Sequence, residues 1–290
     1  MAEEKDVKIS FISKKEYECP VCDEVFRKEE LLSGGGRLIA GALTEELHRL
    51  FEPSAKYGSI FPLAYSLAVC PRCWFASFDA DYPLFPAAKK GEAFAARGRR
   101  KKETLLAFPS ADFSGPRGLM EGAASYYLAM RCYDYYGKDV SPTIKRGLSA
   151  LRGAWLIDEL HLMHPGQNYD WLAVLFRKKA QYFYVQALEK EQRAAETMSA
   201  VKNFGPDIDK NYAYKGMLYL TAYLSYKFGP PAGDTEERKA TLEVAGRTIA
   251  KVFGMGKASK DLPEALLDLA RRVYGAIKEE LEELKARETA

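Results

Sequence analysis

The sequence lacks the long apolar stretch that a membrane-spanning helix needs. Its longest uncharged run, residues 57–71, is shorter than the ~18 residues that such a helix requires, and Pro62 interrupts it. The N-terminal segment is acidic and mixed, with no apolar segment behind it, so we expect no secretory signal peptide. These features together predict a cytoplasmic protein without a membrane span.

An excess of charge of one sign is also missing. Lysine and arginine number 43, aspartate and glutamate number 40, and the net charge is only +3. This balance argues against a protein whose whole surface serves nucleic acid or a membrane, although a local basic patch is compatible with it. Hydrophobic residues make up 47% of the 290 residues, which is enough for a sizeable core, and the length predicts about two domains.

Motifs of catalysis are absent. The chain has no Gly-x-Ser-x-Gly, Walker or dinucleotide-binding fingerprint, and its glycine run at residues 33–36 lacks the lysine and hydroxyl of a phosphate loop, which predicts a turn. Asp158, His161 and His164 step by three, whereas helical zinc hydrolases place histidines at i and i+4, so helix capping is the favoured interpretation. Whether the protein is an enzyme stays open, with a non-enzymatic role favoured and a metal-dependent enzyme the least favoured.

Cysteine is scarce but patterned. Four of the five cysteines form two Cys-x-x-Cys pairs, Cys19 with Cys22 and Cys70 with Cys73. A cytosolic chain does not usually keep such pairs as disulfides, and two pairs of this spacing are the ligand set of one tetrahedral zinc ion. Four thiolates leave no coordination position for water, so the predicted zinc is structural. Cys132 lies in a helical pattern and is predicted to be a core residue.

The residues around both pairs indicate β-hairpins. Ile9 and Phe11 alternate with polar residues ahead of the first pair, and residues 65–69 alternate ahead of the second. We therefore predict a β zinc-ribbon domain over residues 1–82, with each pair in the turn of a hairpin. Between the pairs, apolar residues at positions 39, 43, 47 and 50 have helical spacing and predict an amphipathic helix that carries His48, which we do not expect to bind the metal.

A proline-punctuated basic segment follows over residues 83–116. We interpret it as a linker that is partly helical over residues 91–106. An alternative is that the chain is a nucleic-acid-associated zinc-ribbon protein, because this segment could bind phosphates. The residues in question are Arg97, Arg99, Arg100, Lys101 and Lys102.

The remainder, residues 117–290, has helical periodicity throughout. Glycine and proline punctuation divides it into six predicted helices at residues 119–137, 142–162, 169–198, 209–228, 236–253 and 263–285. Short connections predict antiparallel neighbours. Residues 127–137 resemble residues 219–229, with small residues ahead of an aromatic-glycine ending, which is typical of tetratricopeptide-like hairpins. The fold class predicted is mainly α: a small N-terminal β zinc ribbon, then an antiparallel helical-hairpin array.

Tyrosine is concentrated in this half, with 13 of 18 between Tyr126 and Tyr226. They indicate either an aromatic core between helices or an aromatic-lined groove for a peptide. With catalytic motifs absent, the leading hypothesis is a non-enzymatic, zinc-stabilised scaffold or adaptor that binds a protein partner through its helical array. The predicted contact residues are Tyr127, Trp155, Trp171, Tyr219, Tyr223 and Tyr226.

The chain resembles the bacterial domain-of-unknown-function family 2225. The matching elements are a Cys-Pro-x-Cys knuckle with a following aromatic residue (Cys19–Cys22 and Phe26), a second knuckle at Val69–Ala76, an Ala-Trp-Leu element at Ala154–Leu156 and the penultimate-helix pattern of Met217–Gly229. Trp74 stands where the family usually has glycine, and of the family's pattern between the knuckles only Arg37 and Tyr57 correspond. The resemblance implies the fold and one zinc ion, and no particular reaction.

Overall fold

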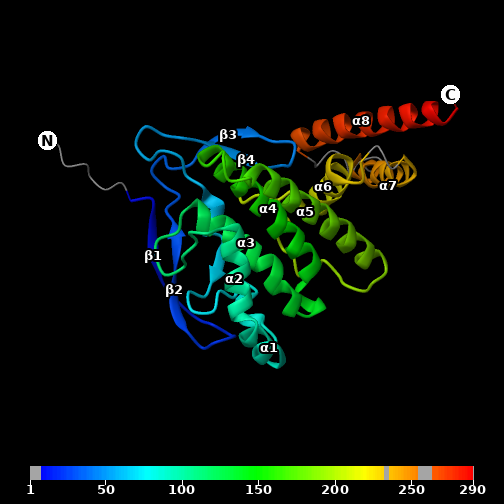
Figure 1. Ribbon diagram of the computed structural model, residues 1–290. Helices are drawn as coiled ribbons and strands as arrows, with labels where there is room; N and C mark the ends of the chain where they lie inside the picture. Colours follow the sequence, from blue (N-terminus) through cyan, green and yellow to red (C-terminus); the bar gives the residue numbers. More distant parts are fainter. Residues whose placement is uncertain (1–7, 232–234, 254–262, 290) are drawn as a thin grey trace.

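The computed structural model describes residues 8–231, 235–253 and 263–289. Strands gather in the N-terminal part and helices follow, so the predicted mainly α class is confirmed (Figure 1). The strands are β1 (Ser10–Glu18), β2 (Val25–Leu31), β3 (Ile39–Leu43), β4 (Arg49–Glu52), β5 (Leu67–Val69) and β6 (Ala76–Phe78). The α-helices are α1 (Lys90–Ala95), α2 (Arg97–Ala107), α3 (Leu119–Cys132), α4 (Pro142–Met163), α5 (Tyr169–Gln192), α6 (Ala213–Phe228), α7 (Thr235–Phe253) and α8 (Glu264–Thr289).

The strands form three separate antiparallel pairs, β1–β2, β3–β4 and β5–β6. The first and third pairs confirm the predicted hairpins, with one Cys-x-x-Cys knuckle in the turn of each. The glycine run at residues 33–36 is a turn, as predicted.

The segment between the knuckles corrects one prediction. Residues 39–50 do not form a helix; β3 and β4 make a hairpin in which Ile39 pairs with Glu52. Gly41 permits this approach, because a Cβ there would lie 3.1 Å from the carbonyl oxygen of Leu50. His48 therefore follows a turn instead of lying on a helix. Short apolar runs fit helix and strand spacing alike, which is why the pattern misled.

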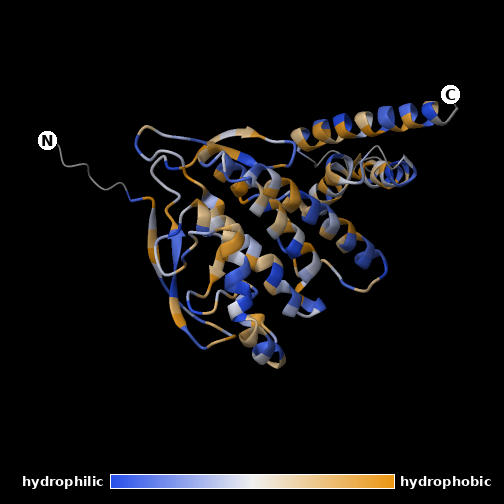
Figure 2. Ribbon diagram, viewed as in Figure 1, coloured by the Kyte–Doolittle hydropathy of each residue, from blue (hydrophilic) through white to orange (hydrophobic). Residues whose placement is uncertain are grey.

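The six long helices predicted for the second half are present as α3 to α8. The largest difference is at α5, which ends at Gln192 instead of at residue 198, just before Ala194 adopts a positive φ of 53°. Figure 2 shows hydrophobic and hydrophilic residues alternating along α8, the mark of an amphipathic helix. No described helix is both long and apolar enough to cross a membrane.

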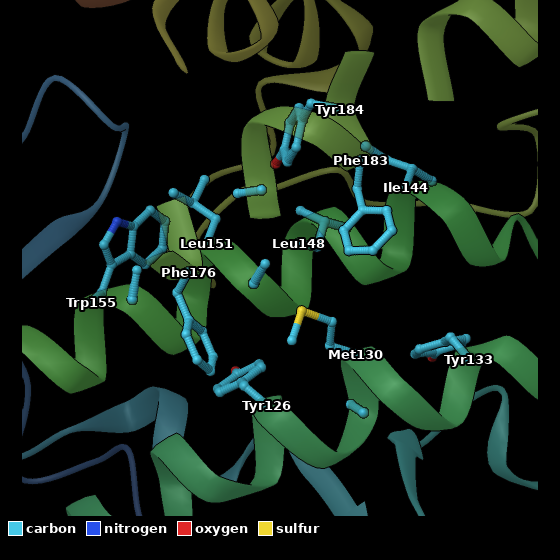
Figure 3. Close-up of a cluster of buried hydrophobic side chains, with 14 of the residues drawn as sticks. Tyr126, Met130, Tyr133, Ile144, Leu148, Leu151, Trp155, Phe176, Phe183 and Tyr184 are labelled. Atoms are coloured by element: carbon cyan, nitrogen blue, oxygen red, sulfur yellow. The ribbon is translucent and has the colours of Figure 1, made fainter. Parts of the chain in front are cut away.

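Helices α3, α4 and α5 pack side by side around an aromatic core. Figure 3 shows Tyr126 of α3 beside Phe176 of α5, in one cluster with Met130 of α3 and with Leu148 and Leu151 of α4. Two glycines of α4 make this possible. A Cβ at Gly147 would lie 2.8 Å from Tyr184, and one at Gly153 would lie 2.8 Å from Phe176, so the two helices meet where α4 has no side chain.

One cluster of buried apolar residues runs from Tyr17 to Leu284 and includes all five cysteines. Cys132 is buried in α3, as predicted. Residues 83–116 also contribute to the cluster, through Phe85, Ala93, Phe108, Ala111 and Phe113. The predicted helical content of this segment is confirmed by α1 and α2. The division into domains at residues 82 and 116 stays a prediction.

Candidate metal centre

The two knuckles bring four cysteine sulfurs together. Cys19 Sγ lies 3.6 Å from Cys73 Sγ, and Cys22 Sγ lies 3.5 Å from Cys70 Sγ. All four sulfurs lie within 4.8 Å of one another, and all four residues are buried. In the part of the chain that the structure describes, no other group of three or more histidine, cysteine or carboxylate side chains has metal-binding geometry.

Both knuckles use the same backbone pattern. The amide of the first cysteine donates to the carbonyl five residues later, from Cys19 to Glu24 at 2.8 Å and from Cys70 to Phe75 at 2.9 Å. In the second knuckle the Cys73 amide also donates to Cys70 Sγ at 3.5 Å. Sulfur atoms that accept backbone hydrogen bonds are favoured as thiolates.

The residue after each second cysteine has a left-handed backbone, with φ of 60° at Asp23 and 58° at Trp74. Glycine adopts positive φ without strain, so the backbone at both positions would suit glycine better than the residues that occupy them. Trp74 is held there by packing. Its ring meets Phe113 edge-on at 5.2 Å between centroids, and Lys101 Nζ lies 5.4 Å from the ring centre.

The donor set fits a metal ion. Tetrahedral coordination with metal–sulfur bonds of about 2.3 Å places sulfurs about 3.8 Å apart, close to the observed spacing. Hydrogen bonds from Cys70 and then Cys73 lower the pKa of Cys19 to about 2. Donating to that thiolate raises the pKa of Cys70 to about 12 and raises the pKa of Cys73 as well. The neighbouring sulfurs therefore favour the thiolate form of Cys19, and a metal cation would stabilise thiolates at all four positions.

A phenol and a guanidinium surround the cluster. Burial first, and then the charge of Cys19, raise the pKa of the buried Tyr82 hydroxyl. Arg100 is only 4% exposed and donates to three carbonyls, those of Cys73 at 2.7 Å, Ala93 at 3.1 Å and Trp74 at 3.2 Å. It thereby fastens α2 to the second knuckle.

Arg100 is one of the five cations that the sequence offers for binding phosphate. Its guanidinium instead binds backbone carbonyls of the protein and is not free to bind phosphate. Arg99 Nε lies 3.9 Å from Glu103 Oε1, and the Lys101 ammonium lies over the Trp74 ring in a cation–π contact. Of the five cations, Arg97, Arg99 and Lys102 are exposed. Sequence patterns carried no signal for the role of Arg100, because its partners are backbone atoms.

The predicted partner-contact residues divide by burial. Trp155, Tyr219 and Tyr223 are buried, Tyr127 and Tyr226 are half-buried, and Trp171 is 64% exposed. The buried ones belong to an aromatic core, and two of them hold the β3–β4 turn. Trp155 Nε1 donates to Glu46 at 2.6 Å, and the Tyr219 hydroxyl donates to the Glu45 carbonyl at 2.7 Å.

The histidines of α4 do not assemble into a site. Asp158 pairs with Arg177 at 2.5 Å, His164 caps the end of α4 with its backbone amide, and neither histidine joins a metal-binding group among the described residues. A contact that the sequence did not predict involves His48, whose Nδ1 hydrogen-bonds Asp207, 159 residues away. Its ring stacks on Trp155 at 4.2 Å between centroids. No local pattern could have indicated this pair.

Comparisons with known proteins support the family resemblance. The family model described as "Uncharacterized protein conserved in bacteria (DUF2225)" matches residues 12–277. An uncharacterized protein of Borreliella burgdorferi is 42% identical over 278 residues, which cover 96% of this chain and 99% of the relative. No solved structure matches.

Proposed function

The chain belongs to the bacterial family DUF2225, and we propose that it is a non-enzymatic cytoplasmic adaptor in which one structural zinc ion holds the β-hairpins and the helical array binds a protein partner. Zinc is favoured because four buried thiolates fill its tetrahedral sphere. Two-stranded hairpins are also marginal by themselves, so a metal that joins two of them contributes directly to folding.

The observation that carries partner binding is an exposed apolar surface at the α4–α5 turn. Leu162 is 73% exposed, Met163 is 60% exposed, and Trp171 follows on the next helix. Val174 and Tyr182 continue along α5 and are also exposed. Positions 171, 174, 178 and 182 recur at helical spacing, so they share one face of α5, on which the exposed Lys178 lies between Val174 and Tyr182. We call Trp171, Val174 and Tyr182 the α5 stripe.

An exposed tryptophan on a helix face that also exposes valine and tyrosine is typical of an interaction site. Single exposed apolar residues are normal, whereas several large ones on one helix face favour a partner that covers them. Tryptophan and tyrosine dominate the binding energy of many protein interfaces. The α5 stripe thus supports Trp171 as the contact residue, in place of the buried members of the predicted set.

The partner hypothesis is tested by crosslinked affinity capture of the full-length chain, followed by mass spectrometry. We compare wild type, the double variant Trp171→Glu/Tyr182→Glu, and Leu106→Glu as a control, because Leu106 is an even more exposed apolar residue but lies on α2. We expect wild type and the control to capture the partner and the double variant to lose it. A partner kept by all three would refute the role of the α5 stripe, and recovery of only RNA or DNA would favour the alternative through Arg97, Arg99 and Lys102.

The metal is tested by elemental analysis of the purified protein. We expect about one zinc per chain in wild type and in Cys132→Ser, whose sulfur lies outside the cluster. Cys22→Ser should lose nearly all of it, because a three-thiolate site binds zinc far more weakly. Iron in place of zinc, or equal zinc in Cys22→Ser, would contradict the assignment.

A further inference from the structure

A cavity of about 610 Å³ lies between β6, α4 and the loop at residues 200–208. Its size falls within the range of binding sites for small organic ligands. It is separate from the four cysteines and from the α5 stripe, since no residue of either lines it. Its most unusual lining residue is Arg152 of α4, which is only 8% exposed.

The Arg152 guanidinium contacts a carbonyl and an aromatic ring instead of a carboxylate. Its Nε donates to the Pro206 carbonyl at 2.6 Å, and its carbon lies 5.4 Å from the centre of the Phe78 ring. Among the described residues no carboxylate lies within ion-pair distance of it, whereas the buried cations Lys145 and Arg177 each pair with one. Removing a guanidinium from water without an anion is costly.

The carboxylates that line the same cavity are already engaged. Asp81 accepts from Lys145 at 2.7 Å and from the Tyr133 hydroxyl at 2.6 Å. Asp207 hydrogen-bonds His48 and accepts from the Arg49 amide. Neither is within ion-pair distance of Arg152.

Two further charged residues line the cavity, and both are exposed. They are Lys202 on the loop and Asp139 ahead of α4. Neither forms an ion pair within the part of the chain that the structure describes, and no lining carboxylate lies within ion-pair distance of the Arg152 guanidinium. The free N–H groups of a guanidinium match the oxygens of a carboxylate or phosphate in a bidentate geometry.

The rest of the wall is apolar. Leu84, Val140, Leu148, Val201 and Ile208 line the cavity around the charged groups. A ligand that contacts both the Arg152 guanidinium and the apolar wall needs an anionic head and an apolar body. We propose that this cavity binds a small organic oxyanion, with its carboxylate or phosphate head on Arg152, its body against these aliphatic side chains, and Lys202 beside the entrance.

Two fluorescent probes with the same apolar body test this proposal. The anionic probe is 8-anilinonaphthalene-1-sulfonate, and the neutral probe is N-phenyl-1-naphthylamine, which lacks the sulfonate. We expect the full-length protein to bind the anionic probe at least about tenfold more tightly, because a charge-assisted hydrogen bond to a buried group carries about that much discrimination. Equal Kd values for the two probes would overturn the proposal.

Variants locate the binding. Arg152→Met should abolish the preference for the anionic probe and leave the Kd of the neutral probe nearly unchanged. Ala200→Phe adds a ring at the cavity wall and leaves the charge of Arg152 in place, so it should weaken the binding of both probes. Lys210→Met removes an exposed lysine that does not line the cavity, so it should change the Kd of neither probe. Retention of the preference in folded Arg152→Met would overturn the proposal.

Should Arg152→Met fail to fold, Ala200→Phe and Lys202→Met decide the question. Unchanged anionic-probe affinity in both would overturn the proposal, and a loss in Ala200→Phe would support it. Displacement of the anionic probe by phenyl phosphate or by phenylacetate then shows which head group the cavity prefers. Failure of both to displace it at millimolar concentration would also overturn the proposal.

Discussion

Arg100 illustrates how a single buried cation can organise a metal-binding loop. Its guanidinium donates to three backbone carbonyls, two of them in the second knuckle. A methionine of similar length would leave these carbonyls without donors in a region closed to water. The loop that presents Cys70 and Cys73 therefore depends on a residue of a helix that follows it in the sequence.

We predict that Arg100→Met lowers the free energy of unfolding by about 3 kcal/mol or more, because it removes several charge-assisted hydrogen bonds to buried acceptors. Urea denaturation of the zinc-loaded protein measures this. Arg99→Met is the matched control, because Arg99 is exposed and its contact with Glu103 is long, and we expect a change within about 0.5 kcal/mol. Equal effects of the two substitutions would contradict the assigned role.

Asp207 gives the protein a pH-dependent contribution to stability. Burial raises its pKa, but hydrogen bonds from His48, Ile208 and Arg49 outweigh burial and leave the pKa below its ordinary value. A carboxyl whose folded pKa is depressed stabilises the protein above its unfolded pKa of about 3.9. That contribution is lost as the pH falls through the folded pKa.

We therefore predict that Asp207→Asn destabilises the protein more at pH 6 than at pH 3. Urea denaturation of both proteins across this range measures the difference in unfolding free energy. A difference that stays constant with pH would show that the ionised carboxylate is not what the His48 contact requires.

At the scale of elements, the packing of α4 on α5 depends on glycine. Gly147 and Gly153 lie where rings of α5 approach within 2.8 Å of an added Cβ, so the helices cannot accept even a methyl group without moving apart. The β3–β4 hairpin docks on the same helices through Glu46, which accepts from Trp155 of α4 and pairs with Arg177 of α5 at 2.7 Å. A shift of either helix would therefore disturb the hairpin as well.

We predict that Gly153→Ala destabilises the protein by about 1–3 kcal/mol through overpacking, despite the higher helix propensity of alanine. The matched control is Gly91→Ala in α1, where an added Cβ meets nothing within 4 Å. That substitution should be neutral or stabilising by up to about 1 kcal/mol. Thermal denaturation of both variants decides it, and a neutral Gly153→Ala would contradict the close packing.

At the scale of the whole molecule, the four-cysteine cluster and the helices share one core. Knuckle residues, the residues of the predicted linker and the helices belong to a single buried cluster. Loss of the metal should therefore weaken the entire protein, not only the hairpins. A structural zinc ion contributes its binding free energy to folding.

We predict that chelation of the metal lowers the Tm by about 10 °C or more, with loss of binding free energy as the cause. Differential scanning calorimetry of metal-loaded and chelator-treated protein measures it. Cys132→Ser should respond as wild type does, whereas Cys22→Ser should already have the lower Tm and should not respond to the chelator. An unchanged Tm in wild type after verified metal loss would refute a structural role.

The sequence by itself determined the features that depend on local spacing. Two Cys-x-x-Cys pairs identified the four sulfurs, alternation placed hairpins around them, and proline and glycine punctuation separated the six long helices. These succeed because each pattern acts within one turn or one element, where backbone geometry and residue type are directly linked. The family resemblance followed from the same local motifs.

Only the tertiary structure decided which side chains are available. It placed Trp155 and Tyr219 in the core, left Trp171 exposed, turned residues 39–52 into a hairpin and joined His48 to Asp207. It also showed that the Arg100 guanidinium binds backbone carbonyls and that Arg152 lines a cavity in which no described carboxylate lies within ion-pair distance of it. Burial and pairing arise between segments far apart in the chain, and their free energies depend on neighbours that local residue patterns do not specify.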